Sequence, residues 1–130
     1  MITDKKQIQT AIDCVLGQEM YLPLTREAFE EICPTPTMAI NVVARDANEA
    51  AFLLKNELSQ INGQQLSGIV VFLQSTSMTM RDLEYINTVF PHCGCVHFKR
   101  GISFTKPESG EVEIWFFATT CKKTKFPRYK

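Results

Sequence analysis

The sequence has no long apolar run and no clustered glycines. No stretch approaches the roughly 18 apolar residues that a membrane-spanning helix needs. The first ten residues, MITDKKQIQT, lack the basic start and apolar core of a secretory signal peptide. The six glycines stand singly, without the Gly-x-x-x-x-Gly-Lys-Ser/Thr pattern of a phosphate-binding loop. We therefore expect a cytoplasmic protein without a membrane span or such a loop.

Cysteine is present, but it forms no framework that would indicate a disulfide scaffold. The five cysteines are an odd number without regular spacing, at Cys14, Cys33, Cys93, Cys95 and Cys121. This usage is typical of reduced thiols in the cytosol. A chain of 130 residues can bury roughly two-thirds of its unfolded surface without a metal or disulfide. We expect a single domain over residues 1–121.

Charge is balanced overall but unevenly distributed. The last nine residues, KKTKFPRYK, carry five positive charges and no acid, at Lys122, Lys123, Lys125, Arg128 and Lys130. Residues 1–121 then hold nine basic and fourteen acidic side chains. We expect residues 122–130 to be a mobile tail. The alternative is contact with an anionic surface or nucleic acid, where Phe126 and Tyr129 could stack on bases. The body of the chain has no basic stripe to support that alternative.

Hydrophobic periodicity and capping residues predict four helices. The first covers residues 3–19 with Thr3 as its cap, and leads into a loop over residues 20–28. Thr25 can cap a short second helix that runs through Cys33. Asp46 can cap a third, with Glu49 in the capping-box position, and Asn62-Gly63 stops it. Thr79 can cap a long fourth helix that ends at Pro91.

Four apolar segments predict strands: MAINVVA (38–44), GIVVFLQ (68–74), GCVHFKRGISF (94–104) and EVEIWFFATT (111–120). The second is continuously apolar, which is typical of a strand covered on both faces. The last two are separated by TKPESG, a turn-rich connector, and we expect them to form a hairpin. The fold class is therefore α/β (α+β), a four-stranded mixed sheet packed with helices in the order ααβαβαββ.

The segment HCGCVH places two cysteines beside both histidines of the chain. Strand alternation puts Cys93, Cys95 and His97 on one face, where they could supply three zinc ligands. Such neighbours lie roughly 7 Å apart on a strand, too far to converge at about 2.0–2.3 Å from one ion. We expect a structural strand and no metal. Metal binding, thiol catalysis and small-molecule binding at these residues remain alternatives, which thiol labelling of the native protein would test.

Four motifs in sequence order resemble the C-terminal half of FtsZ, the bacterial relative of tubulin. The most similar is LSGIVVFLQSTSMTMRDLEYINTVF (66–90), an apolar strand, a small-residue turn and an amphipathic helix. ARDANEAAFLL (44–54) is similar to the preceding helix of the family, and GEVEIWFFATT (110–120) to its closing strand. IDCVLGQEMYLPLTREAFEEI (12–32) resembles the end of the family's central helix, its catalytic loop and the next short helix.

The resemblance implies a fold and a contact surface, but it argues against GTP hydrolysis. The catalytic loop of the family carries Asn-x-Asp-Phe-x-Asp, whereas this chain has Pro23, Thr25, Arg26 and Ala28 at the matching positions. Neither threonine nor alanine can polarise water as a carboxylate does. The half of the family that binds GTP precedes the central helix and has no counterpart in this sequence. We expect neither GTP binding nor a cofactor.

A non-enzymatic protein–protein interaction domain is the function that this resemblance implies. It would associate with itself or dock on a FtsZ-like polymer in cell division, through its first helix and residues 20–28. Docking there would cap a filament end, because the next subunit would find no nucleotide pocket. The expected contact residues are Leu22, Pro23, Leu24, Thr25, Arg26 and Ala28.

Overall fold

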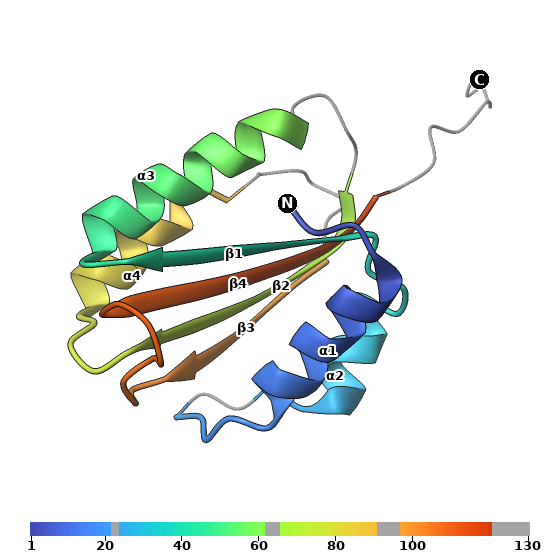
Figure 1. Cartoon of the computed structure of the whole chain (residues 1–130), viewed down its shortest axis with the longest axis horizontal. Helices are drawn as coiled ribbons and strands as arrows, with labels where there is room; N and C mark the ends of the chain where they lie inside the picture. The colour runs from blue at the N-terminus through green and yellow to red at the C-terminus, as the bar shows by residue number, and fades with distance from the viewer. Residues whose placement is uncertain (22–23, 62–65, 91–96, 121–130) are drawn as a thin grey trace.

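The computed structural model describes residues 1–21, 24–61, 66–90 and 97–120. Within these ranges the chain forms four α-helices, a short 3-10 turn and four strands (Figure 1). The helices are α1 (Lys5–Leu16), α2 (Arg26–Ile32), α3 (Ala47–Leu58) and α4 (Met80–Asn87), and the turn η1 (Ser59–Ile61) follows α3. The strands are β1 (Met38–Ala44), β2 (Leu66–Ser75), β3 (His97–Ser103) and β4 (Val112–Thr120). The predicted α+β fold with a four-stranded mixed sheet and four helices is confirmed.

The strands are ordered β1-β4-β2-β3 across the sheet. Strand β4 runs antiparallel to both β1 and β2, whereas β2 and β3 are parallel. The predicted hairpin of the last two strands is therefore wrong, because β2 lies between them. The observed strand order follows from burial. Strands β2 and β4 are apolar enough for the centre of the sheet, whereas β3 begins with exposed residues at 97–99, which an edge position tolerates.

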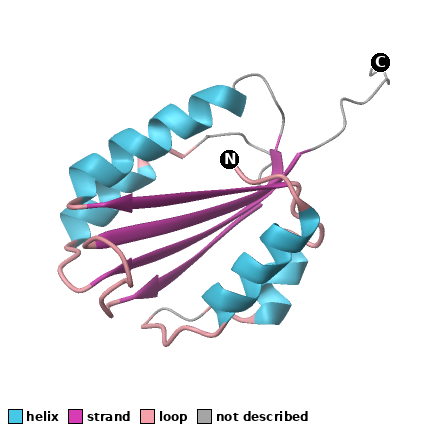
Figure 2. Ribbon diagram, viewed as in Figure 1, coloured by secondary structure: helices cyan, strands magenta, loops and turns pink. Residues whose placement is uncertain are grey.

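Helices cover both faces of the sheet (Figure 2). Side chains of β2 alternate between the two faces, so Ile69 and Leu73 pack with α3 and α4 while Val70 and Phe72 pack with α1 and α2. All four are buried, which confirms the prediction of a strand covered on both faces. No helix in the described ranges is long and apolar enough to cross a membrane.

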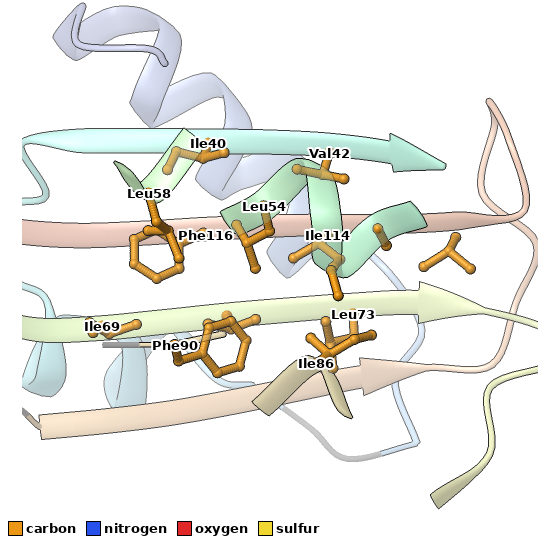
Figure 3. Packing of buried hydrophobic residues seen from close by; sticks show 14 of the residues in the cluster. Ile40, Val42, Leu54, Leu58, Ile69, Leu73, Ile86, Phe90, Ile114 and Phe116 are labelled. Atoms are coloured by element: carbon orange, nitrogen blue, oxygen red, sulfur yellow. The ribbon is translucent and has the colours of Figure 1, made fainter. Parts of the chain in front are cut away.

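The larger of the two cores lies between the sheet and helices α3 and α4. Figure 3 shows Leu54 and Leu58 of α3 above Ile114 and Phe116 of the central strand β4. Phe90, which follows α4, stacks against Phe116 with ring centroids 6.3 Å apart. Burying each such side chain contributes about 1.5–3 kcal/mol to folding.

The smaller core lies between the sheet and helices α1 and α2. Phe29 of α2 meets Phe117 of β4 edge-on, with ring centroids 5.2 Å apart. Helix α2 approaches β2 so closely that a methyl group on Gly68 would overlap the carbonyl of Ile32. Glycine at this position therefore lets α2 lie directly against the strand.

Three of the four predicted helix caps are confirmed. Thr25 accepts a hydrogen bond from the Ala28 amide at 3.1 Å. Asp46 accepts one from the Glu49 amide at 2.8 Å. Thr79 and Asp82 form a reciprocal capping box, with bonds of 3.0 and 3.1 Å.

Other details of the helices differ from prediction. Asp4, not Thr3, caps α1, because a carboxylate is a stronger acceptor for the helix N-terminus than a hydroxyl. The helix ends at Leu16, before the poor helix former Gly17. The expected capping-box bond of Glu49 goes to the Arg45 amide instead of Asp46, at 2.9 Å.

Helix α4 is also shorter than predicted. It ends at Asn87, before the β-branched pair Thr88 and Val89. The predicted stops at Asn62-Gly63 and Pro91 lie outside the described residues.

Candidate protein-interaction surface

Two described residues of the segment that joins α1 to α2, Tyr21 and Leu24, contact the edge strand β3. The Tyr21 amide donates a hydrogen bond to the carbonyl of Ile102 at 2.7 Å. Leu24, on the α2 side of the segment, is buried beside Gly101. The Leu24 amide in turn points at the Met20 sulfur at 3.2 Å. These contacts fix both ends of the segment on the sheet.

An exposed pair of aromatic rings lies beside this attachment. The rings of Tyr21 and Phe104 are 5.0 Å apart between centroids and tilted by 50°. Tyr21 is 76% exposed and Phe104 is 42% exposed. Among the ring contacts of the described residues, this is the pair in which both rings face solvent. Packed aromatic rings that remain exposed are typical of protein contact surfaces.

Phe104 is held in place by hydrogen bonds on either side of it. The hydroxyls of Ser103 and Thr105 lie 2.8 Å apart, and Ser103 is buried. The Gln74 side-chain amide of β2 donates to the Thr105 hydroxyl at 2.9 Å. Because β2 is the buried central strand, the Phe104 backbone is anchored to the rigid part of the molecule.

Three predicted contact residues lie at the start of α2. The Thr25 hydroxyl caps the helix through the amide of Ala28, which is half-buried. The Arg26 guanidinium lies 3.0 Å from the Asp13 carboxylate of α1. That hydrogen bond, with a second from Gln9, holds the pKa of Asp13 below its usual value. Thr25 thus caps α2, and Arg26 connects the start of α2 to α1.

The other predicted site residues are distributed as follows. Leu24 faces the core, while Leu22 and Pro23 lie outside the described residues. His97 is exposed at the start of β3, and the rest of the predicted ligand set, Cys93 and Cys95, lies outside the described residues. The basic tail, Lys122, Lys123, Lys125, Arg128 and Lys130, also falls outside them. Among the residues that the structure does describe, no three His, Cys, Asp or Glu side chains gather as a metal site would require.

Cys33 lies in the environment of a structural thiol. Its sulfur is buried and lies 3.0 Å from the Thr119 hydroxyl. Burial raises the pKa of the Cys33 thiol, and the hydrogen bond to Thr119 only partly offsets this. A neutral, enclosed thiol is a weak nucleophile.

A small hollow of about 180 Å³ lies where the N-termini of α3 and α4 approach the end of β2. Three of its polar side chains already have partners. Asp46 and Asp82 cap their helices, and the Ser75 hydroxyl accepts a hydrogen bond from the Ser77 amide at 3.2 Å. These three side chains therefore have roles in local structure.

Sequence reasoning did not identify Tyr21 or Phe104 as contact residues. Tyr21 lies within the predicted loop 20–28, and Phe104 was assigned to the end of a strand. The only signal was an aromatic residue near the C-terminal end of a predicted element, just past the helix 3–19 for Tyr21 and at the last strand residue for Phe104. Their contact depends on how β3 is placed, which the sequence pattern does not show.

No family model matches the chain, and no curated protein matches its sequence.

Proposed function

We propose that this protein is a non-catalytic interaction domain with the fold of the C-terminal half of FtsZ. It docks on a protein partner through a surface formed by Tyr21, Phe104 and the start of α2, which we call the aromatic surface. The observation that carries this proposal is the exposed and anchored ring pair. Tyrosine is enriched among residues that dominate binding energy at interfaces. The hydrogen bonds that hold the backbone at Tyr21 and beside Phe104 lower the entropic cost of docking.

A FtsZ-like polymer is the partner that the resemblance favours. In that family the matching loop enters the neighbouring subunit, so the resemblance implies a subunit contact at the part of the aromatic surface formed by Tyr21 and the start of α2.

The absence of catalysis in this proposal follows from the residues at the loop. Thr25 is engaged in capping α2, and Arg26 in pairing with Asp13. A hydroxyl and a guanidinium cannot act as the general base for an attacking water at neutral pH. The surface therefore supports binding without turnover.

Co-sedimentation with FtsZ from the same organism tests the proposal. FtsZ and GTP are mixed with the protein, and assembly is followed by light scattering and pelleting. We expect the protein to alter assembly or to appear in the pellet. The double variant Tyr21→Ser, Phe104→Ser should weaken this effect at least about ten-fold, because it removes both rings.

Phe52→Ser is the matched control. Phe52 is 62% exposed on α3, so its replacement removes one exposed ring elsewhere on the fold. It should bind like the unmodified protein. No effect at several-fold excess would reject the FtsZ partner. Association of the protein with itself that depends on the two rings would instead assign the aromatic surface to a second copy.

A further inference from the structure

The two edges of the sheet, β1 and β3, are protected to different degrees. Edge strand β3 carries Lys99 and Arg100, and its Ile102 carbonyl is already bonded to Tyr21. Charged side chains and covering segments are common means of preventing another chain from pairing with an edge. Strand β1 reads MAINVVA and has no charge, proline or glycine.

The edge of β1 already accepts an antiparallel segment at one position. Ile2 and Ala39 exchange two backbone hydrogen bonds, of 2.7 and 2.8 Å. Because backbone groups alternate in direction along a strand, those of Asn41 and Val43 point outward like those of Ala39. Among the described residues, no backbone hydrogen bond reaches the outward groups of Asn41 or Val43. Both side chains are exposed, Val43 to 36%.

We propose that the outer edge of β1 at Asn41 and Val43, the β1 edge, binds an extended segment of a partner protein by antiparallel strand addition. The outward amides and carbonyls of these two residues offer four hydrogen bonds. The bound segment would extend to Asn41 and Val43 the antiparallel pairing that Ile2 forms with Ala39. A binder of this kind needs an extended backbone without proline, and alternate side chains select its sequence.

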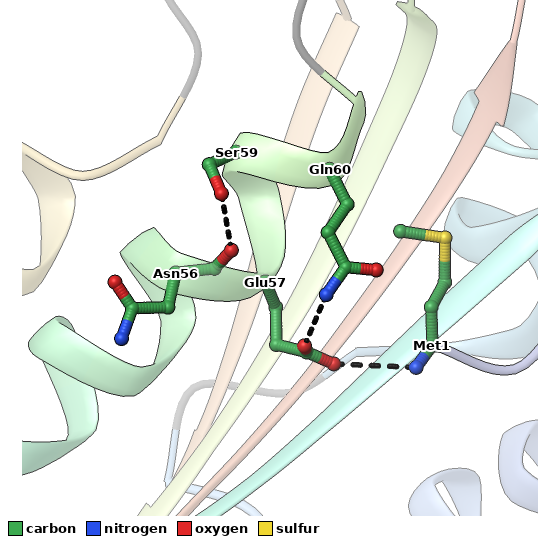
Figure 4. A network of polar contacts seen from close by, with 5 residues as sticks. All are labelled: Met1, Asn56, Glu57, Ser59 and Gln60. Carbon is green, nitrogen blue, oxygen red and sulfur yellow. Dashed lines mark hydrogen bonds and ion pairs between the residues drawn. The ribbon is translucent and has the colours of Figure 1, made fainter.

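Acidic groups on both faces of the sheet favour a segment with basic residues. On the α3 side, the Glu57 carboxylate takes the Met1 α-ammonium at 3.2 Å and the Gln60 amide at 3.0 Å (Figure 4). On the other side, Glu113 accepts a hydrogen bond from the Asn41 side chain at 2.9 Å. A lysine or arginine of the added strand would reach a carboxylate whichever way it points.

The position of α3 favours a single strand over a second copy of this chain. The Glu57–Met1 contact shows that α3 reaches out to the segment that pairs with β1. A second copy joined edge to edge would bring its own α3 toward the same space. A lone strand would need beside Asn41 and Val43 only as much space as Ile2 occupies beside Ala39. Because the aromatic surface is bonded to the opposite edge strand, β3, this inference does not depend on the proposed function.

A synthetic basic peptide, acetyl-Lys-Val-Thr-Val-Thr-Val-Lys-amide, is the probe for this edge. Titration into ¹⁵N-labelled protein should shift the amide signals of Asn41 and Val43 and slow their hydrogen exchange. A peptide with aspartate in place of both lysines should bind at least about ten-fold more weakly. Its two end residues point to the same face of the added strand, so they would place like charge on the side of either Glu57 or Glu113.

Two variants distinguish binding of the peptide by strand pairing at the β1 edge from binding elsewhere on the protein. Val43→Pro removes an outward amide that β4 does not use, so the sheet should persist while binding is lost. Val43→Lys keeps every backbone group and places a like charge beside the basic peptide, so it should weaken binding about five-fold or more. Tyr21→Ser, at the opposite edge, should leave it unchanged.

Three outcomes would overturn the inference. They are no shift at millimolar peptide, equal binding by a folded Val43→Pro variant, or a dimer of the protein that Val43→Lys dissociates. The last would assign the edge to a second copy.

Discussion

Gly101 of β3 lies directly against Leu24, the residue that anchors the α1–α2 segment. A methyl group on Gly101 would come within 2.8 Å of the Leu24 Cβ and 3.2 Å of the Met20 sulfur. The contact therefore needs a residue without a side chain. The attachment of the aromatic surface to β3 therefore depends on this one glycine of the edge strand.

Gly101→Ala should destabilise the protein by about 1–3 kcal/mol, the usual cost of overpacking. The extra methyl group would push Leu24 away from β3 and weaken the Tyr21–Ile102 hydrogen bond. Chemical denaturation followed by the fluorescence of Trp115, the only tryptophan, measures the free energy of unfolding. Faster hydrogen exchange at the Tyr21 amide would report the local displacement.

Gly17→Ala is the matched control for that variant. A methyl group on Gly17 would meet its neighbours at 3.4 and 3.6 Å, which is near ordinary contact, and its φ of −82° suits alanine. We expect a change of less than about 1 kcal/mol, in either direction. Equal losses in the two variants would mean that the Gly101–Leu24 contact has no special role.

Local chemistry explains which parts of this fold could be predicted from the sequence. The bounds of β1 at Met38 and Ala44 agree with prediction, because a short apolar run ends at a charged turn. The caps at Thr25, Asp46 and Thr79 are also confirmed, since capping involves residues three apart in the chain. These features need no knowledge of the tertiary structure.

The strand order and the aromatic surface could not be predicted in the same way. Strand β4 inserts between β1 and β2 because the burial of whole strands decides their order, and this is a property of the complete sheet. Tyr21 and Phe104 meet because the Tyr21 amide is bonded to Ile102 of β3, two residues before Phe104. Hydrophobic periodicity does not report contacts between segments that are distant in the sequence.

Arg26→Ala should raise the pKa of Asp13 toward its usual value, as measured by NMR titration. The Arg26 hydrogen bond is the largest cause of the lowered pKa, and the Gln9 hydrogen bond is the second. Gln9→Ala should therefore raise the pKa by a smaller amount. A larger effect of Gln9→Ala would contradict this ranking.

The same pair implies a pH dependence of stability. A carboxyl whose folded-state pKa is depressed stabilises the protein while it is ionised. Its contribution is present above the pKa of the unfolded chain and is lost as pH falls through the lowered pKa of Asp13. The difference in unfolding free energy between the unmodified protein and Arg26→Ala should shrink in acid. A difference that grows in acid would exclude the ion pair as its source.

Cys14 and Cys33 should react with a thiol reagent at very different rates. Cys14 is exposed on α1, whereas Cys33 is buried and the pKa of its thiol is raised. Peptide mapping after brief labelling of the native protein should find Cys14 modified and Cys33 intact. Cys33 should become reactive only when denaturant unfolds the chain. Rapid native labelling of Cys33 would show that the smaller core opens, and the labelling of Cys93 and Cys95 in the same experiment tests the thiol-site alternative.

The double variant Thr25→Asp, Ala28→Asp places carboxylates at the two loop positions where the proposed resemblance to FtsZ would have them. It should fold, because aspartate caps helices at least as well as threonine and an acid in the first turn of α2 is favourable. Thr25→Ala, which removes the cap, should instead lower the free energy of unfolding by about 1 kcal/mol. In the FtsZ family these acids act on a nucleotide held by the neighbouring subunit, so carboxylates alone should give the isolated protein no GTPase activity. Phosphate release from GTP above the level of the unmodified protein would contradict the non-catalytic function proposed for this domain.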